Sequence, residues 1–161
     1  MRHLLVVTSL LVAVALPARA QSATRTPSVP GAHLAAETVV KRLASADLRA
    51  LLEEAGFAIE SVQGDTLVIG RDDDLRLAVN LTNDGQLVHV WVAFTGTKAT
   101  LEFVNDWNRE SLLSRAYLDE DGDPTIETEL DIEGGVTGAR IRDYLRTTRK
   151  IVGEFASKLP Y

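Results

Sequence analysis

Four short apolar runs, separated by turn-forming residues, constrain the fold of this chain more than any other feature. The runs are FAIESV, TLVIGR, LRLAVNL and LVHVWVAF, and the segments QGD, DDD and TNDGQ lie between them. In the third run, Leu75, Leu77 and Val79 alternate with more polar or smaller side chains, which is typical of a strand with one buried face. The fourth run is apolar on both faces, which favours a central position. The pattern predicts an antiparallel meander.

Helical patterns precede, interrupt and follow these strands. SADLRALLEEAGF has leucines at helical spacing, with Ser45 as the expected N-cap. Thr97 is expected to cap a second helix that ends near Glu110, and Thr137 a third that ends near Lys158. The segment ETVVKRL before the first helix fits either a strand or a helix.

Two further strands, LLSRAYLD and TIETELDI, lie between the second and third helices. The expected order is therefore α-β-β-β-β-α-β-β-α. Hairpin-joined strands interrupted by helices indicate an α+β domain, in which a largely antiparallel sheet packs against helices.

The N-terminus is typical of an export signal. Arg2 and His3 precede the apolar stretch LLVVTSLLVAVALP, and ARA supplies a small-residue cleavage site after Ala20. The apolar stretch is shorter than the ~20 residues that a membrane-spanning helix needs. We therefore expect a cleaved signal peptide at residues 1–20, a flexible linker at 21–35 and one domain at 36–161. The expected location is periplasmic or extracellular.

The charge and the absence of cysteine exclude several classes of function. The chain has a formal net charge of −6 at pH 7 and becomes more acidic when residues 1–20 are removed. This charge disfavours nucleic acid and anionic membrane surfaces, both of which attract basic proteins. The chain contains no cysteine, so disulfides, thiol catalysis and thiolate metal sites are excluded.

Residues 117–135, YLDEDGDPTIETELDIEGG, hold eight carboxylates and no basic side chain. Asp119, Asp121 and Asp123 have the spacing of the first three ligands of a calcium loop. However, Pro124 replaces the required glycine and Leu130 the closing glutamate. An Asp-Gly hairpin explains this stretch better, and a cation site at the three aspartates is the weaker alternative.

No catalytic, cofactor or metal-binding arrangement is recognisable. Glu127, Glu129 and Asp131 alternate on the polar face of a predicted strand, so we expect them to be solvated. The mature chain has only His33 and His89, without triad or metal partners at a known spacing, and GTKAT at residues 96–100 is not a phosphate-binding loop. Trp91 and Trp107 are predicted to be core residues.

The last predicted helix carries six basic and two acidic side chains. Arg142, Arg146, Arg149 and Lys150 are therefore the candidate partner face. These charges fit three arrangements: pairing with the acidic hairpin within one molecule, pairing between subunits, or contact with a partner.

Residues 103–145, which begin FVNDWNRESLLSRAYLDEDGD, resemble the YbjN family of bacterial proteins, known as "putative sensory transduction regulators". The opening helix, LRALLEEAGF, is also similar to that family. The positions that match the family signature are Trp107, Asn108, Arg115, Tyr117, Gly122, Gly134 and Gly135. The resemblance implies a fold like that of type III secretion chaperones, in which these residues determine the fold.

The resemblance further implies protein binding, with a homodimer as one form of it. We therefore expect a non-enzymatic, exported protein-binding domain without cofactors, in an envelope regulatory or chaperone-like role. The alternative is a small-ligand or divalent-cation module that uses the acidic hairpin.

Overall fold

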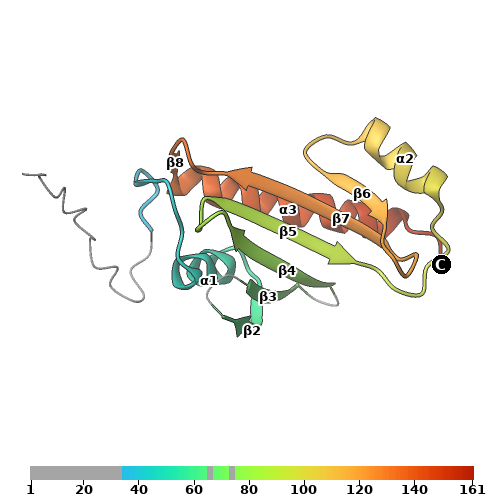
Figure 1. Cartoon of the computed structure of the whole chain (residues 1–161), viewed down its shortest axis with the longest axis horizontal. Helices are drawn as coiled ribbons and strands as arrows, with labels where there is room; N and C mark the ends of the chain where they lie inside the picture. Colours follow the sequence, from blue (N-terminus) through green and yellow to red (C-terminus); the bar gives the residue numbers. More distant parts are fainter. Residues whose placement is uncertain (1–33, 65–66, 73–74) are drawn as a thin grey trace, which may run out of the picture.

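The computed structural model describes residues 34–64, 67–72 and 75–161. The predicted signal peptide and most of the predicted linker, including His33, lie outside the described residues. Within them the structure has three helices, a six-stranded sheet and a two-stranded sheet (Figure 1). In chain order the elements are β1 (Val39–Val40), α1 (Ser45–Glu54), β2 (Ala58–Gln63), β3 (Leu67–Asp72), β4 (Leu75–Thr82), β5 (Leu87–Ala93), α2 (Leu101–Glu110), β6 (Arg115–Leu118), β7 (Pro124–Asp131), β8 (Val136–Thr137) and α3 (Gly138–Lys158).

The large sheet is antiparallel throughout, with strand order β2-β3-β4-β5-β7-β6. The predicted α+β class and the order of helices and long strands are confirmed. The ETVVKRL segment contains the short strand β1, which pairs with β8 immediately before α3. This pairing ties the start of the domain to the start of the last helix.

Two of the three expected helix caps are wrong by a few residues. Ala44, not Ser45, is the N-cap of α1, because the backbone of neighbouring Leu43 is bonded to Gly85 and the helix begins directly after it. Thr100, not Thr97, caps α2, since the Lys98 N–H donates to the Pro160 carbonyl and keeps this segment out of the helix. Thr137 caps α3 as expected, accepting the Arg140 N–H at 3.2 Å.

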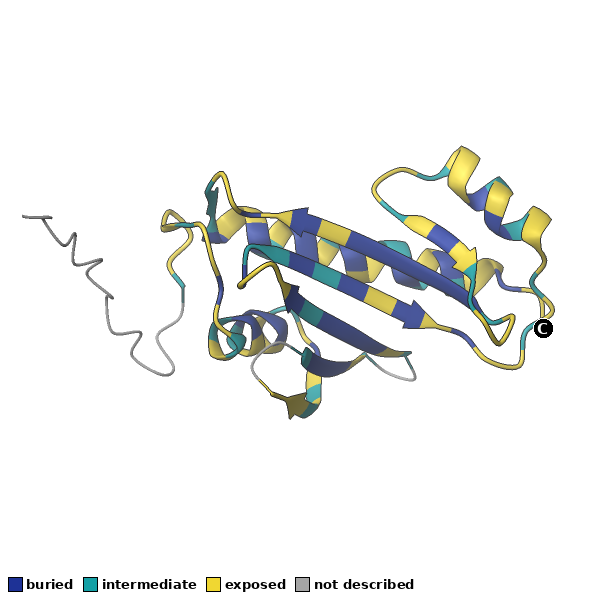
Figure 2. Cartoon of the chain, viewed as in Figure 1, coloured by how far each residue is buried: buried dark blue, intermediate teal, exposed yellow. Residues whose placement is uncertain are grey.

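One face of the sheet holds the core. Inward side chains from neighbouring strands, such as Val68, Val79 and Val90, are 0–1% exposed and pack with leucines of α1 and with Phe155 of α3. In Figure 1, α3 runs behind β5 and β7. Figure 2 shows the buried and exposed positions alternating along β5. The hydrophobic face therefore fixes both the register of the sheet and the placement of the helices.

The opposite face of the sheet carries the outward residues of the same strands. In β5 these are His89, Trp91 and Ala93, because Val88, Val90 and Val92 face the core. Trp91 is 37% exposed, so the expectation that it is a core residue is wrong. Trp107 on α2 is buried as predicted, and its ring meets that of Phe155 edge-on at 5.0 Å.

Candidate functional site

The four basic residues predicted as a partner face lie around one cavity. Arg142, Arg146, Arg149 and Lys150 on α3 line a space of about 560 Å³. The end of α1 contributes Glu54 and Ala55, and the facing strands contribute Asp72 and Leu75. We call this space, together with its lining residues, the α3 groove. Its size is within the range of ligand-binding cavities, and its apolar and cationic lining suits an acidic, partly apolar ligand.

Two of the four basic residues in the α3 groove, Arg142 and Arg149, form ion pairs with acidic side chains of the same chain. Arg142 Nε donates to Glu54 Oε2 at 2.6 Å, and a second nitrogen of Arg142 donates to the Leu34 carbonyl. Arg149 bonds both carboxylate oxygens of Asp72, an arrangement that fixes the planes of both side chains. These two residues therefore brace α3 against α1 and β3.

Arg146 and Lys150 are the cations of the α3 groove that form no ion pair with another element among the described residues. Arg146 is 66% exposed at its side chain and lies 3.5 Å from Asp143 on the same helix, which is a weak surface pair. Lys150 is exposed and forms no ion pair within the described residues. A ligand would therefore meet Arg146 and Lys150 first, while Arg142 and Arg149 keep the walls in place.

The acidic hairpin does not supply the partners of α3. In the described part of the chain, Arg142 and Arg149 pair with α1 and β3 instead. The hairpin itself forms as predicted, with Gly122 at φ +83° and its N–H donating to the Asp119 carbonyl. The carboxylate of Asp119 accepts the backbone N–H groups of Asp121 and Asp123 at 3.0 and 2.8 Å. Asp119 therefore stabilises the turn.

Neither a metal cluster nor a membrane span is found in the described ranges. No three His, Cys, Asp or Glu side chains converge there closely enough to hold a metal ion. Among the same residues, none of the helices combines the length and hydrophobicity that crossing a bilayer requires.

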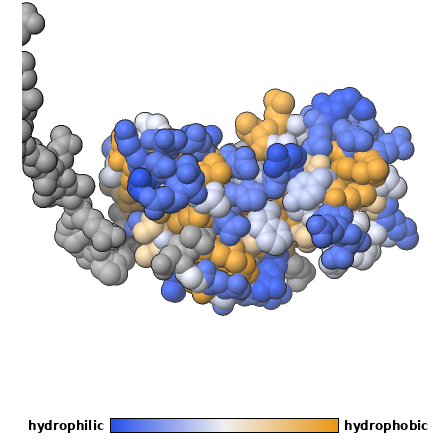
Figure 3. Space-filling view, viewed as in Figure 1, coloured by the Kyte–Doolittle hydropathy of each residue, from blue (hydrophilic) through white to orange (hydrophobic). Residues whose placement is uncertain are grey.

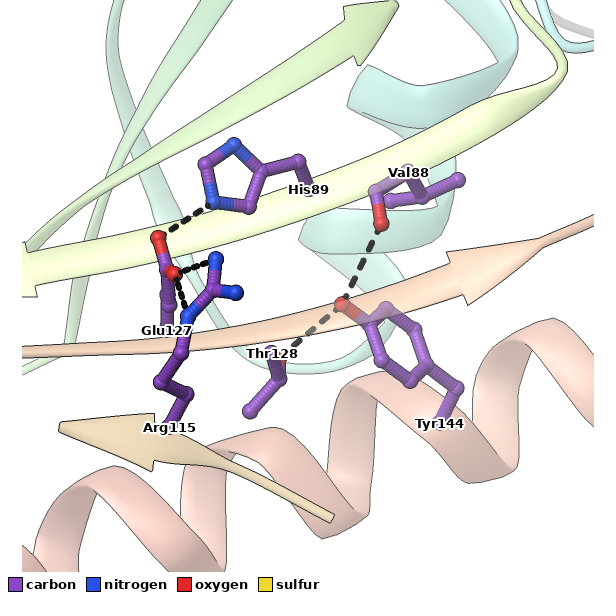
Figure 4. A network of polar contacts seen from close by, with 6 residues as sticks. All are labelled: Val88, His89, Arg115, Glu127, Thr128 and Tyr144. Atoms are coloured by element: carbon purple, nitrogen blue, oxygen red, sulfur yellow. Dashed lines mark hydrogen bonds and ion pairs between the residues drawn. The ribbon is translucent and has the colours of Figure 1, made fainter.

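Glu127 is the largest departure from the expected polar face of β7. It was predicted to be solvated, yet it is only 6% exposed. Arg115 on β6 and His89 on β5 stand on either side of it and hold its carboxylate, His89 Nε2 at 3.0 Å and Arg115 through a close ion pair (Figure 4). The hydrogen bond and charge of Glu127 raise the pKa of Arg115, and burial followed by Glu127 raises the pKa of Tyr117.

Burial of Glu127 follows from its position in the sheet. Its strand is flanked on both sides at this point, so long neighbouring side chains lie across it. Glu129, two residues further along the same face, is exposed. The alternating pattern predicts which face a residue occupies, but not whether a neighbour covers it.

A second polar cluster lies on the helix side of the sheet. Thr128 Oγ1 lies 2.9 Å from the Tyr144 hydroxyl (Figure 4). It also lies 3.0 Å from the Thr148 hydroxyl, and all three residues are at most 5% exposed. Burial raises the pKa of Tyr144 to about 12. This cluster fixes α3 against β7, because each buried hydroxyl must keep a hydrogen-bond partner.

Several positions of the family signature make contacts that hold the fold together. The Asn108 side chain donates to the Ala116 carbonyl and accepts the Ala116 N–H, both at 2.8 Å. This pair of bonds replaces a neighbouring strand at the outer edge of β6. Trp107 Nε1 donates to Ser114 at 3.1 Å, while Arg115 holds Glu127.

The remaining signature positions belong to turns or to the helix-free face. Gly122 and Gly135 have φ of +83° and +96°, which favours glycine. A Cβ at Gly135 would stand 3.1 Å from Val39 of β1, whereas one at Gly134 would meet open space. Tyr117 is 39% exposed on the helix-free face. Gly134 is a signature residue for which the structure shows no packing constraint.

The fold and these contacts define a small α+β domain with a groove lined by four basic side chains of α3. Comparison of the sequence with protein families matches residues 45–160 to the YbjN family, described as "Putative bacterial sensory transduction regulator". The chain belongs to this family. Among curated proteins, no significant match is found.

A solved structure supports the same fold. It is described as the crystal structure of "YbjN, a putative transcription regulator from E. coli". The two chains share 19% identity with a TM-score of 0.51, and the match covers 70% of this chain and 91% of the other. At this identity the likeness concerns the fold alone.

Proposed function

We propose that this protein is an exported, non-enzymatic binding domain that recognises an acidic segment of another protein in the α3 groove, in an envelope regulatory or chaperone-like role. The observation that carries the proposal is the meeting of Arg142, Arg146, Arg149 and Lys150 around one cavity whose lining also includes the apolar Ala55 and Leu75. The groove offers cationic side chains together with apolar contact, as acidic peptide segments require.

The four basic residues differ in their contacts, and this difference decides which of them are suitable for mutation. Reversal of Arg142 or Arg149 would remove a contact between elements, so loss of binding would be confounded by loss of structure. Arg146 and Lys150 are exposed, and their reversal leaves the walls of the α3 groove intact. The informative variant is therefore R146E/K150E.

A matched control is R49E/R109E. Arg49 and Arg109 are also exposed helix residues, and their ion pairs are local, with Glu53 for Arg49 and with Asp106 and Glu110 for Arg109. The control has the same change in net charge, but neither position lines the α3 groove. Equal melting temperatures for both variants and the wild type would establish that the fold is retained.

The experiment uses the full-length chain with a C-terminal tag in its native host. A photo-crosslinking residue beside the groove should yield one reproducible adduct, whose partner is identified by mass spectrometry and then purified. The expected result is that R146E/K150E weakens binding of the purified partner at least tenfold and that R49E/R109E does not. Equal effects of the two variants, or an adduct formed only with a second copy of the chain, would contradict the proposal.

Export is tested separately in the same strain. Cell fractionation and N-terminal sequencing should find the tagged protein outside the inner membrane, beginning at Gln21. An intact Met1 in the cytoplasmic fraction would refute export but leave the α3 groove proposal standing.

A further inference from the structure

Half of β7 has a strand on only one side. β7 pairs with β5 from Thr125 to Asp131, but with β6 only from Pro124 to Glu127. Leu113 adopts φ +65° two residues before β6 begins at Arg115, so the extended conformation of β6 does not continue back to it. Beyond Glu127, no described strand continues the sheet beside β7.

The backbone hydrogen bonds show which groups point to this open edge. Ile132 N–H donates to the Gln86 carbonyl at 2.8 Å, and Phe94 N–H donates to the Pro124 carbonyl at 3.0 Å. In an antiparallel pair such bonds recur at every second residue, so the even-numbered residues of β7 face β5. Asp119 N–H donates to the Asp123 carbonyl at 3.0 Å, which continues the β6 ladder through the odd-numbered residues. The N–H and C=O of Glu129 and Asp131 therefore face the open edge.

The molecule closes the neighbouring edge but not this one. At the outer edge of β6, the Asn108 side chain satisfies both backbone groups of Ala116. In the described residues, no side chain performs this role at Glu129 or Asp131. Exposed strand edges promote pairing with another strand unless they are blocked.

The open edge is bordered by a cavity on each face. One, of about 220 Å³, is lined by Arg115, Glu127 and Glu129 on the helix-free side. The other, of about 240 Å³, is lined by Glu129 and by α3, whose Tyr144 and Ile151 stand there beside the polar side chains of Arg140, Asp143, Thr147 and Thr148. Leu113 borders both cavities. Side chains of an added strand point alternately to the two faces, so each cavity would receive every second residue.

The charges beside the edge select the occupant. Within the sheet, Arg115 stands directly opposite Glu127 and pairs with it. Glu129 and Asp131 continue the same row as exposed acids and form no ion pair in the described part of the chain. Opposite charges directly across an antiparallel pair stabilise it, so basic residues suit these two positions.

Apolar surface is also present next to the edge. Leu112 and Leu113 are 84% and 73% exposed. Figure 3 shows an apolar protrusion above the start of β6, where the loop between α2 and β6 runs. Adjacent exposed leucines in a left-handed turn are unfavourable in an isolated domain, and contact with a bound segment would cover them.

We propose that the open edge of β7 at Glu129 and Asp131 adds an extended segment of a partner protein as a further strand. The sequence pattern of the added segment is basic–apolar–basic. Its two basic residues stand opposite Glu129 and Asp131, and its apolar residue faces Tyr144 and Ile151. This mode is β-strand addition, in which backbone bonds provide affinity and alternate side chains provide specificity. The site is separate from the α3 groove and does not depend on it.

The test uses residues 21–161, which is the predicted mature protein, and a peptide of alternating lysine and valine whose two termini are blocked. Its matched control peptide alternates glutamate and valine. We expect saturable binding of the lysine peptide only, with slowed amide exchange at Glu129 and Asp131 measured by NMR. Absence of saturable binding, or binding without protection of these two amides, would overturn the proposal.

Variants of the protein then separate the edge from general acidity. E129K should weaken binding of the lysine peptide about five- to tenfold, because it replaces an attractive cross-strand pair with a repulsive one. E120K makes the same change at the exposed hairpin tip and should leave binding unchanged, and E129Q should give a smaller loss without charge reversal. Equal losses in E129K and E120K would exclude the edge. Concentration-dependent self-association that protects the same amides would identify a second copy as the occupant, against the proposal.

Discussion

Substitution of Glu127 tests whether the buried ion pair stabilises the helix-free face. In E127A the carboxylate between Arg115 and His89 is lost, together with the close ion pair and the 3.0 Å histidine contact. Hydrogen bonds to charged groups contribute about 1.5–3 kcal/mol each. Arg115 is 67% exposed at its side chain and regains water, which reduces its share of the loss. We expect E127A to lower the free energy of unfolding by about 2 kcal/mol.

The matched control lies two residues away on the same strand and face. Glu129 is exposed, so E129A should change the free energy of unfolding by less than about 0.5 kcal/mol. E127Q keeps the shape of the side chain and one accepting oxygen, and should fall between the two alanine variants.

The assay is urea unfolding followed by circular dichroism, supported by thermal unfolding. For a domain of this size, a loss of about 2 kcal/mol corresponds to a melting temperature roughly 6–10 °C lower. If E127A and E129A prove equally stable, the burial of Glu127 contributes nothing to stability and the reasoning fails.

Three further predictions concern other parts of the molecule. The neutral Tyr144 phenol stabilises the fold fully below its ordinary pKa near 10, and this stability is lost as pH rises through about 12. Wild type should therefore lose about 1 kcal/mol more unfolding free energy than Y144F between pH 9 and 11. Urea unfolding at both pH values measures this, and equal losses in the two proteins would refute the prediction. In G85A, a Cβ would stand 2.4 Å from the Leu43 carbonyl at φ +78°, so we expect a loss of about 2 kcal/mol or more, and a melting temperature equal to wild type would contradict the steric reason. Because Asp119 accepts two backbone N–H groups of its own turn, millimolar calcium should leave the melting temperature unchanged; a rise that D123N abolishes would instead support a cation site.

The pattern of apolar residues was sufficient to predict the class and order of the fold, because that pattern encodes which faces are buried. It also predicted the hairpin at Gly122 and the cap at Thr137, where local chemistry decides the backbone. The caps at Ala44 and Thr100 were missed because distant backbone bonds, to Gly85 and Pro160, set where those helices begin. Such contacts leave no local signal in the sequence.

The candidate sites were predicted in part for the same reason. Helical spacing brought the four basic residues of α3 to one face, but it carried no information about Glu54 and Asp72, which lie far away in the sequence. Glu127 and Glu129 are indistinguishable by pattern, and only the register with β6 separates a buried acid from an exposed one. The left-handed Leu113 has no signal in the local sequence, since leucine does not favour that conformation.

The pairing of charges changes what the net charge of this protein means for binding. Glu54 and Asp72 neutralise two arginines of the α3 groove, and Arg115 neutralises the one buried acid of β7. At the two proposed surfaces, the exposed charges left for a partner are therefore few: Arg146 and Lys150 on α3, and Glu129 and Asp131 on β7. Exposed charges of this kind act mainly on association rate and orientation, while desolvated contacts decide affinity. Affinity at either surface must then come from what lies between the charges, which is the apolar part of the groove lining in one case and the backbone of β7 in the other.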